Sequence, residues 1–585
     1  MVVEGGTLPE QFQASLARNP DAPALAARSA AGGWDRWTYR ELGEAVACLA
    51  CGLLEAGVGR GDRVAILGPN SMAWHVADQA ALHIGAVTVP LYDTVPPAEQ
   101  AFVLADSGAK VLLVHDAARW ARLEPRRVEF PGLVLVAVLE PSTSMLSLPA
   151  LTASGRAAHE KDSGLFARAW KSVTPADVAT LIYTSGTTGR PKGVVLTHGN
   201  LAFNVATVST IEPVGPGDVT VSFLPLSHSL QRVAELTFLA NGVAIHHARS
   251  FESLPQDLLD VRPTILVGVP RVWEKAYRAV VARVEQEPAW KQRVFRATLA
   301  AGLEVVRAGD DRRPARLKDR ALAAFGRRVV FRPLRERFGG RLRWLVSGGA
   351  PLSPDIERFF LAAGIPLLQG YGLTEAAPIL TLNFPDDHRT GTVGKPMRGV
   401  EVRVAEDGEI LGRGPGIARG YWDRPRDTSE TFDAEGWLHT GDLGSFDELG
   451  FLHVTGRKKE LIVKSNGKKL APEPVEKRLE SEPEIHQAVL LGEGRSYCAA
   501  LVVPNAAAFG GRPPAELADD PEVRVRVDAA LKRVNDGLAH HEQVYRVALL
   551  DRELTVEGGE LTPSLKVKRR VVAERFAKEI ERLFS

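Results

Sequence analysis

LIYTSGTTGRPKGVVL, residues 181–196, joins two apolar, β-prone runs through a loop of small residues. Every residue from Thr184 to Gly189 is Thr, Ser or Gly, and Lys192 follows them closely. Glycines leave backbone N–H groups open to a close ligand, and hydroxyl groups add donors without bulk. A lysine beside such a loop supplies a point charge. The stretch therefore predicts a loop that grips a polyphosphate.

Two other interpretations of this stretch compete with that one. A segment rich in Gly, Ser and Thr can be an ordinary surface loop. A Walker P-loop needs the pattern GxxxxGK[ST] at the start of a helix. Here Lys192 is followed by Gly193 and a β-prone run, with no Ser or Thr after the lysine. The pattern predicts strand–loop–strand and argues against a P-loop NTPase.

Length and composition bound the class of protein. The chain has 585 residues, enough for about two to four domains. A net charge of +1 gives no bulk attraction to nucleic acid, and three cysteines fit a reducing compartment rather than a disulfide framework. The N-terminus lacks a signal-peptide pattern, and no apolar run is long enough to span a bilayer. We expect a cytoplasmic protein; contact with a membrane surface and a homodimer remain open.

Residues 1–175 alternate between helical and strand patterns, which predicts an open sheet covered by helices. Cys48 and Cys51 lie in a helix-like run, 42–56, and are interpreted as two buried small residues. Residues 140–175 are polar and small and are predicted to form a surface connection. The further elements expected here are strands at 63–67, 85–91, 110–115 and 133–139 and a helix at 74–84.

FLPLSHSL, residues 223–230, places His228 between small residues after an apolar strand. A lone histidine is more often a structural residue than a functional one, so both interpretations stay open. The apolar runs 236–242 and 264–270 could line a tunnel or belong to an ordinary core. His246 and His247 have no ligand-like neighbours in the sequence and do not predict a zinc site.

A strongly basic segment runs from Arg312 to Arg337, with ten Lys or Arg against two acidic residues. Leu, Ala, Val and Phe are interleaved with these charges. A basic amphipathic segment can lie on anionic lipid. A solvated helical hairpin has the same pattern, and it is the favoured interpretation because Pro314 and Pro333 interrupt the helix.

Two stretches in the second half of the chain offer groups suited to a nucleotide. WLVSGGAPL, residues 344–352, predicts a strand, a Gly-Gly turn and a following helix, and such a turn lets a flat ring approach the backbone. LLQGYGLTE, residues 367–375, offers the aromatic face of Tyr371, the hydroxyl of Thr374 and the carboxylate of Glu375. Each group alone could belong to ordinary turn chemistry.

The last third of the chain carries three more stretches of interest. GWLHTGDLG, residues 436–444, places Asp442 on a glycine-flanked turn, where it can accept hydrogen bonds from a ribose diol or simply form the turn. GFLHVTGRKKELIVKSNGKKLAP and ELTPSLKVKR follow at 450–472 and 560–569. From about residue 460 the pattern predicts a smaller α+β unit, with a helix at 474–482 and strands at 488–491 and 498–503.

These motifs together resemble the adenylate-forming superfamily of acyl-CoA synthetases, luciferases and nonribosomal adenylation domains. YTSGTTGRPKG is similar to its phosphate-binding signature, and at least six motifs match in family order over nearly the whole chain. The resemblance implies ATP, Mg²⁺ and CoA, with Thr184 and Glu375 at the metal. It implies these nucleotide-binding residues: Thr184, Ser185, Gly186, Thr187, Thr188, Gly189, Lys192, Gly348, Gly349, Ala350, Pro351, Gln369, Gly370, Tyr371, Gly372, Thr374, Asp442 and Arg457.

The resemblance also implies a division of labour along the chain. Residues 1–456 would form a large domain of β-sheets covered by helices, with a distorted β-barrel subdomain, that binds ATP and the acyl group near His228. Residues 457–460, with Lys459, would be a hinge, and 461–585 would be a small, mobile α+β domain. In that domain Lys566 takes the catalytic position beside Thr184 and Glu375, while Ser465, Asn466 and Gly467 lie where the family binds CoA. Lys468 and Lys469 could meet CoA phosphates or be surface charges.

The function implied by the resemblance is that of a fatty acid–CoA ligase. A fatty acid of medium to long chain would attack the α-phosphorus of ATP to give acyl-AMP, and the CoA thiolate would then take the acyl group. LTPSLKVKR, residues 561–569, is similar to the form in long-chain members. The alternatives are a fatty acyl-AMP ligase that loads a carrier protein, an aryl- or small-acid–CoA ligase, and a nucleotide-binding scaffold without catalysis.

Overall fold

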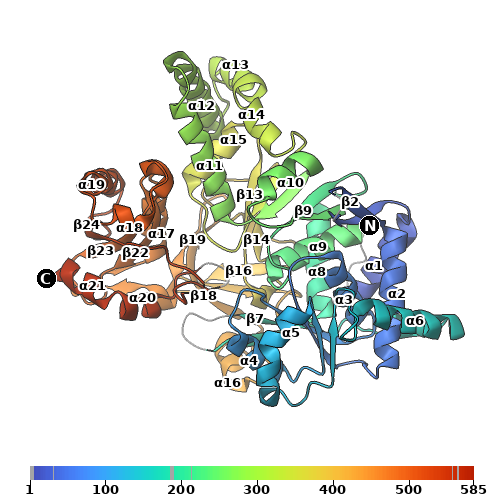
Figure 1. The fold of residues 1–585 in the computed structure, drawn as a ribbon. Helices are drawn as coiled ribbons and strands as arrows, with labels where there is room; N and C mark the ends of the chain where they lie inside the picture. Colours follow the sequence, from blue (N-terminus) through green and yellow to red (C-terminus); the bar gives the residue numbers. More distant parts are fainter. Residues whose placement is uncertain (1–5, 30–31, 185–189, 212–213, 557, 563–565) are drawn as a thin grey trace.

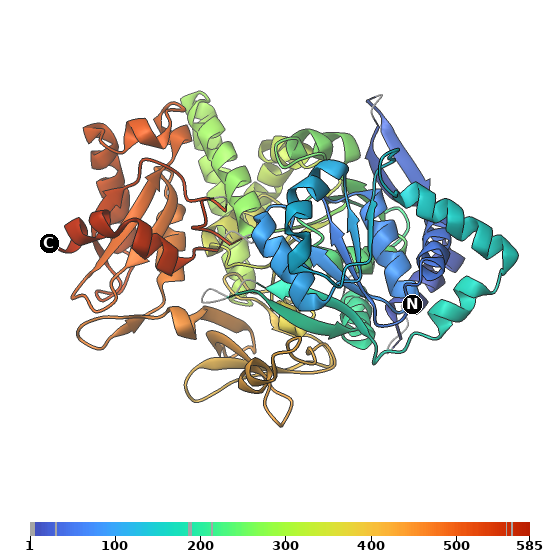
Figure 2. The same ribbon diagram turned by 60° about the horizontal axis from the view of Figure 1, so that its bottom comes forward.

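The computed structural model of the chain describes residues 6–29, 32–184, 190–211, 214–556, 558–562 and 566–585. Residues after about 460, drawn in orange and red, lie at one side of a larger body that holds the N-terminus (Figures 1 and 2). This large-plus-small α/β architecture confirms the predicted fold class.

The largest sheet has six strands in the order β6–β5–β3–β4–β7–β8. Neighbouring strands are parallel from β6 to β7, and β8 runs antiparallel to β7. Both faces of β4 and β5 are buried along their full length, which is why these parallel strands read as unbroken apolar runs. The strands are β3 (Arg63–Leu67), β4 (Val87–Leu91), β5 (Val111–Val114), β6 (Leu135–Val138), β7 (Val178–Thr184) and β8 (Lys192–Thr197).

Two further sheets complete the first part of the body, in the orders β2–β1–β10–β9 and β11–β12–β13–β14–β15. The first comprises β1 (Pro23–Arg28), β2 (Trp34–Thr38), β9 (Val219–Ser222) and β10 (Ala244–His247). The second comprises β11 (Ile265–Gly268), β12 (Trp344–Ser347), β13 (Leu367–Tyr371), β14 (Thr381–Leu382) and β15 (Lys395–Pro396). The runs at 236–242 and 264–270 pack within hydrophobic core clusters, for example through Leu239 and Leu266.

Helices cover these sheets. They are α1 (Leu8–Arg18), α2 (Tyr39–Glu55), α3 (Met72–His83), α4 (Pro97–Ser107), α5 (Ala117–Leu123), α6 (Leu148–Lys161), α7 (Leu165–Lys171), α8 (His198–Ile211), α9 (Ser229–Asn241), α10 (Leu254–Val261), α11 (Pro270–Glu285), α12 (Ala289–Asp310), α13 (Leu317–Phe325), α14 (Arg332–Arg337), α15 (Pro354–Ala362) and α16 (Pro425–Thr431). No helix in the described part of the chain combines the length and apolar character needed to cross a bilayer.

The segment 140–175 does connect β6 to β7 with mostly exposed or half-buried residues, as predicted, but it contains two helices that the sequence analysis did not expect, α6 and α7. The side chain of Ser147 caps the first turn of α6. The small residues that suggested a loop instead let two helices approach closely. A Cβ atom on Gly155 of α6 would lie 1.8 Å from the backbone oxygen of Cys48, on α2. Cys48 and Cys51 are buried, as predicted.

The polyphosphate-type loop joins two adjacent antiparallel strands. Thr184, at the end of β7, is the register partner of Lys192, at the start of β8. This arrangement confirms the predicted strand–loop–strand unit. Ser185, Gly186, Thr187, Thr188 and Gly189 lie outside the described residues.

A four-stranded antiparallel sheet follows, with β16 (Glu401–Val404), β17 (Glu409–Arg413), β18 (Leu438–Phe446) and β19 (Leu452–Arg457) in sequence order. Its strand order is open, so the described residues form no closed ring of strands here. The distorted β-barrel implied by the resemblance stays a prediction.

The chain beyond β19 builds its own small cores. A hairpin, β20 (Ile462–Val463) and β21 (Lys469–Leu470), precedes a three-stranded sheet of β22 (Ile485–Leu491), β23 (Cys498–Pro504) and β24 (Val544–Leu549). The sequence prediction missed β24. Two apolar clusters contain only residues between 462 and 584. The helices are α17 (Pro472–Glu480), α18 (Pro514–Leu517), α19 (Pro521–Asn535), α20 (Arg569–Arg575) and α21 (Ala577–Phe584).

The small unit contacts the large one through α17 and α11. Arg278 on α11 donates a hydrogen bond of 3.0 Å to the backbone oxygen of Glu480. Lys477 on α17 lies 3.8 Å from Glu274, and Arg278 lies 3.7 Å from the same glutamate. The division of the chain at 457–460, and the mobility of the small unit, stay predictions.

Candidate active site

The candidate site gathers at the carboxyl ends of β12 and β13, the edge where open α/β sheets place ligands. These two strands are parallel neighbours, with Ser347 opposite Gln369. Gly348, Gly349, Ala350 and Pro351 follow β12 as a turn, and Gly349 has φ of +80°, which favours glycine. The predicted strand, turn and helix are confirmed here, since α15 begins at Pro354.

Three side chains form a hydrogen-bonded triad beside this edge. The Tyr371 hydroxyl donates to Asp442 Oδ2 over 2.7 Å, and Arg457 Nε donates to Asp442 Oδ1 over 2.6 Å. Asp442 and Arg457 are also register partners on β18 and β19. The triad thus unites residues that the sequence analysis selected from three separate motifs.

The electrostatics of the triad fix its protonation state. Burial and the Asp442 carboxylate both raise the pKa of Tyr371 well above its ordinary value, so this hydroxyl stays a donor. Burial acts to lower the pKa of Arg457, but the Asp442 carboxylate outweighs it and the net shift is upward. Each carboxylate oxygen of Asp442 keeps a lone pair beyond these two bonds, which a ribose hydroxyl could use.

A second chain of contacts joins Glu375 to the start of β8. The Tyr421 hydroxyl donates to Glu375 Oε1 over 2.7 Å. The ammonium of Lys192 lies 5.3 Å from the centre of the Tyr421 ring, within cation–π range. Lys192 also forms an ion pair with Asp427 on α16. Glu375 and Lys192 therefore both contact Tyr421, and Thr184 is the β-ladder partner of Lys192.

Thr374 and His228 are brought together by α9. The hydroxyls of Ser229 and Thr374 lie 3.1 Å apart. His228 caps α9, its Nδ1 accepting a hydrogen bond from the backbone N–H of Leu230 over 3.2 Å. Burial, and to a smaller degree Lys566, lower the pKa of His228 to about 4. The ring is therefore neutral near pH 7 and has the structural role of a cap, whatever else it contacts.

Lys566 reaches this site from the small unit. Burial and Arg457 lower its pKa, while Glu473, Asp442 and Glu460 oppose that shift. The lysine therefore lies within electrostatic range of the Asp442–Arg457 pair. The backbone N–H of Lys566 donates a hydrogen bond to the Thr562 hydroxyl over 3.0 Å. Among the described residues its ammonium has no hydrogen bond or ion pair.

Other predicted nucleotide-binding residues support the site through the backbone. Gly372 packs so closely that a Cβ atom would lie 1.8 Å from the oxygen of Pro378, and a Cβ on Gly370 would lie 2.9 Å from Leu382. The side chain of Gln369 donates to Glu357 over 2.7 Å. Glu357 is buried, and its burial raises its pKa to about 8. The Gln369–Glu357 pair is therefore part of the buried packing beside β13.

The residues expected at the hinge and the CoA site lie at the surface. Lys459 is exposed in a short turn, Lys458–Glu460, directly after Arg457. Its neighbour Lys458 makes the ion pairs, with Asp407 at 2.5 Å and Glu409 at 3.0 Å. Ser465, Asn466 and Gly467 form the exposed tip of the β20–β21 hairpin, where Gly467 has φ of +76°.

Sequence reasoning missed several residues that complete these contacts: Ser229, Tyr421, Asp427 and Glu473. Ser229 lies inside the stretch 223–230 beside His228, but nothing local in the sequence indicates the partners of Ser229 or of Tyr421. Lys192 and Asp427 are separated by 235 positions. Backbone contacts along β8, among them the pairing of Val194 with Tyr421, bring these segments together.

A buried polar cluster also joins α3, α9 and β10. His75 Nε2 and Glu235 Oε2 are 2.7 Å apart, and the possible metal-ligand atoms of His75, Glu235 and His247 all lie within 4.8 Å of one another. The sequence analysis found no such neighbours for His247 because they come from α3 and α9. Glu235 also accepts a hydrogen bond from Gln231, so hydrogen bonds within the cluster already account for this carboxylate.

Adenine, ribose and a phosphate chain need an aromatic face, a diol acceptor and positive charge in succession. Tyr371 and Asp442 offer the first two groups in the triad, and Lys192 offers the third in the separate set of contacts around Tyr421. This combination is typical of the adenylate-forming class of enzymes. Residues 12–422 match the family of AMP-binding enzymes, and residues 459–585 match the C-terminal domain of AMP-binding enzymes. The chain belongs to this family.

Individual relatives agree with the family match. The chain is 37% identical over 566 residues to the long-chain-fatty-acid–CoA ligase FadD15 of Mycobacterium bovis, covering 95% of this chain and 93% of that protein. It is 31% identical to long chain acyl-CoA synthetase 7 of Arabidopsis thaliana, covering 100% and 87%. In fold it matches the adenylation domain of a carboxylate reductase from Mycobacterium chelonae, with a TM-score of 0.77, 24% identity and coverage of 99% and 91%.

Proposed function

We propose that this protein is a fatty acid–CoA ligase that activates a medium- or long-chain fatty acid with ATP and transfers the acyl group to CoA. The observation that carries the proposal is the joining of Tyr371, Asp442 and Arg457 into one triad with Lys566 in electrostatic range. The 37% identity to a long-chain-fatty-acid–CoA ligase over 93% of its length supports the substrate class.

The first half-reaction brings negative groups together, since a carboxylate must attack the α-phosphorus of ATP. Catalysis is therefore mostly positioning and charge screening. Tyr371 offers a face to the adenine, Asp442 accepts from the ribose hydroxyls, and Thr374 and Lys192 contact the phosphates. Lys566 adds a positive charge where the pentavalent phosphorus forms, and a well-placed charge of this kind contributes about 3 kcal/mol to the barrier.

The residues at Glu375 fit a magnesium ion. One carboxylate oxygen of Glu375 accepts from Tyr421, and the other remains available. Mg²⁺ prefers one or two carboxylates together with substrate phosphate oxygens and water. Glu375 and Thr184 would hold the ion, which would supply positive charge to the phosphate oxygens of ATP. Tyr421 orients Glu375 for this task.

The second half-reaction requires a different access route to the acyl-AMP. The thiolate of CoA attacks the acyl carbonyl, the C–S bond forms, and AMP leaves with the electron pair of the broken C–O bond. Lys566 occupies this side of the site in the present arrangement. A rotation of the small unit about Lys459 would move Lys566 away. The same rotation would bring Ser465, Asn466 and Gly467 toward the pantetheine of CoA.

The experiment measures pyrophosphate release with ATP, Mg²⁺ and a panel of carboxylic acids of increasing chain length, together with aryl acids. Each acid is tested with and without CoA. The proposal expects turnover to peak with medium or long fatty acids and to require CoA. Release that ignores CoA would favour a carrier-loading acyl-AMP ligase, and a peak with aryl or short acids would favour the small-acid alternative. The homodimer stays a prediction.

A further inference from the structure

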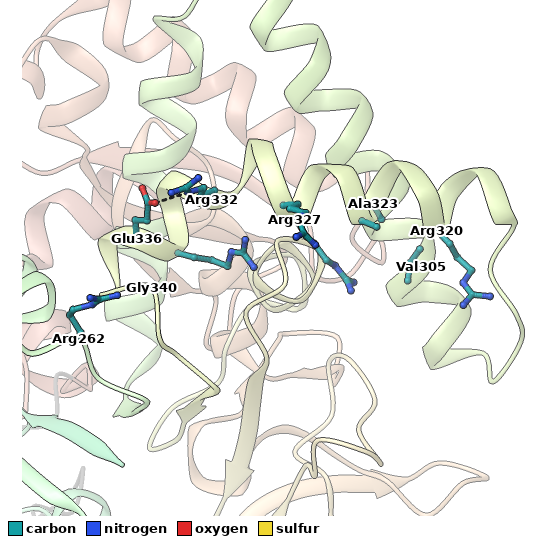
Figure 3. Close-up of a pocket in the computed structure, with 11 residues that line it drawn as sticks. Arg262, Val305, Arg320, Ala323, Arg327, Arg332, Glu336 and Gly340 are labelled. Atoms are coloured by element: carbon teal, nitrogen blue, oxygen red, sulfur yellow. Dashed lines mark hydrogen bonds and ion pairs between the residues drawn. The ribbon is translucent and has the colours of Figure 1, made fainter. Parts of the chain in front are cut away.

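A wide cavity of about 900 Å³ opens on the surface beside α13 and α14, and none of its lining residues belongs to the candidate active site. Figure 3 shows arginine side chains reaching into this space from α13, η2 (Gly326–Val330) and α14, with Arg262 at the far side. The lining residues are Arg262, Val305, Arg320, Ala323, Ala324, Arg327, Arg328, Arg332, Arg335, Glu336 and Gly340.

The cavity carries a large excess of positive charge. Six arginines line it against one carboxylate, Glu336, which pairs with Arg332 over 2.7 Å. Within the described residues Arg320, Arg328 and Arg335 form no ion pair. Burial, and to a smaller degree the nearby charge of Arg335, lower the pKa of Arg327. The cavity therefore attracts anions.

The same helical segment exposes an apolar stripe. Leu322, Phe325 and Val329 are 38%, 48% and 54% exposed. Their spacings of three and four residues place them next to one another along α13 and η2. A hairpin that is merely solvated gains nothing from such a stripe, because apolar side chains in water are unfavourable. The solvated-face interpretation that the sequence favoured does not account for it.

We propose that α13, η2 and α14 form a docking surface for an anionic phospholipid membrane. The arginine cavity receives phosphate headgroups, and Leu322, Phe325 and Val329 enter the boundary between headgroups and acyl chains. Basic and apolar side chains combined on one helical segment are typical of interfacial binding. Figure 1 shows α12 and α13 projecting from the body.

A soluble phosphate compound would use only half of these features. It would pair with the arginines but would leave the apolar stripe in water. The cavity is also open and wide, which suits several headgroups of a surface better than one small ligand. The inference does not rest on the proposed function, because membrane binding is measured without substrates.

The test is co-sedimentation of the full chain with vesicles made of equal parts of phosphatidylcholine and phosphatidylglycerol, compared with pure phosphatidylcholine. The proposal expects binding to the anionic vesicles only, and weaker binding as salt is raised. The triple variant Arg320→Gln, Arg328→Gln, Arg335→Gln should bind about a hundredfold more weakly, since each arginine near an anionic surface contributes about fivefold.

A matched control removes the same charge elsewhere. Arg426, Arg524 and Arg570 are solvent-facing on α16, α19 and α20, and their joint change to Gln should leave vesicle binding nearly intact. An equal loss in both triple variants would mean that net charge alone drives binding and would overturn the docking surface. Pyrophosphate release by all variants with a soluble acid reports that each one is folded.

Two further experiments distinguish binding to a lipid surface from binding of a free phosphate. Phe325→Ser with Val329→Ser should weaken binding at high salt, whereas Val128→Ser with Val134→Ser, two exposed valines elsewhere, should not. Inorganic tripolyphosphate is titrated into the protein as the soluble probe. Tight tripolyphosphate binding, lost in the arginine variant, together with no effect of the Phe325 and Val329 changes, would contradict the proposal and assign the cavity to a soluble anion.

Discussion

The part of the site on β13, β18 and β19 and the part carried by Lys566 are held in different ways. Tyr371, Asp442 and Arg457 fix one another by hydrogen bonds of 2.6 to 2.7 Å before any ligand binds. The ammonium of Lys566 has no such anchor among the described residues, and its place depends on where the small unit lies. We call the triad preorganised, because its hydrogen bonds exist before a ligand binds. We call Lys566 delivered, because the small unit brings it to the site.

This difference has a consequence for the two half-reactions. If the proposed roles hold, groups in the preorganised part would contact the nucleotide in both halves, because acyl-AMP retains the adenine and ribose. Under the same proposal Lys566 would be needed only in the first half-reaction, in which pyrophosphate leaves. Substitutions in the two parts should therefore damage the reaction in different patterns.

The largest effect is expected at Glu375. Glu375→Gln removes the carboxylate proposed to hold Mg²⁺, so adenylation should fall by about 10²–10³-fold, the size seen for single preorganised electrostatic groups. Pyrophosphate release is measured as a function of Mg²⁺ concentration, and half-saturation should move upward. Glu430→Gln, an exposed carboxylate on α16, is the control and should change neither value. Unchanged Mg²⁺ dependence in Glu375→Gln would remove this residue from the metal site.

Asp442→Asn should weaken both half-reactions. The change removes the charge that binds Arg457 and the ribose, and a hydrogen bond to a charged group is worth about 1.5–3 kcal/mol. We expect the KM for ATP and the Kd for acyl-AMP each to rise by about 10- to 100-fold. Both are measured separately, with the exposed Asp386→Asn as control. Damage confined to one half would contradict a shared nucleotide site.

The pH dependence of adenylation tests the electrostatic setting of Lys566. The lysine must be charged, so the rate should fall as pH rises through its pKa, which burial and Arg457 hold below the ordinary value. Glu473 opposes that shift, so Glu473→Gln should move the fall to still lower pH. The measurement is the pH–rate profile of pyrophosphate release. An unchanged pH–rate profile in Glu473→Gln would mean that Lys566 does not cause the decrease in rate at high pH. Lys566→Arg, if active, should show no decrease in rate over this pH range, because arginine stays charged.

The smallest effect is expected at the contact between α11 and α17. Arg278→Ala removes the hydrogen bond to Glu480 and should favour departure of the small unit. A partly exposed contact of this kind is worth up to about 1 kcal/mol, so adenylation should slow only about fivefold or less. Thioester formation from supplied acyl-AMP should be unchanged or faster. Arg283→Ala, exposed on the same helix, is the control, and slowing of both halves in Arg278→Ala would contradict this role for the contact.

Local patterns predicted much of the fold. Parallel strands buried on both faces read as apolar runs, so β3 was predicted with its observed bounds, Arg63–Leu67. The strand–loop–strand form of the phosphate motif followed from the β-prone residues after Lys192. The prediction failed at α6, because Gly155 looks like a loop residue until Cys48 on α2 is known to lie against it.

The residues of the candidate site likewise divide into those that local motifs predicted and those that the sequence did not reveal. Motifs identified Tyr371, Asp442, Arg457 and Lys566, because each lies in a local pattern that resembles the family. Tyr421 was missed because its partners, Glu375 and Lys192, are distant in the chain and meet only through folding. The exposure of Phe325 was missed for a related reason, since burial depends on neighbours that a sequence does not display.

The most direct test of the delivered lysine is the pair of half-reactions in Lys566→Ala, with Lys568→Ala as the neighbouring control. Pyrophosphate release from ATP and fatty acid is measured in one assay, and acyl-CoA formation from supplied acyl-AMP and CoA in another. We expect Lys566→Ala to abolish the first and largely spare the second, while Lys568→Ala spares both. Equal loss of both halves in Lys566→Ala would contradict the distinction between a preorganised nucleotide site and a delivered catalytic group.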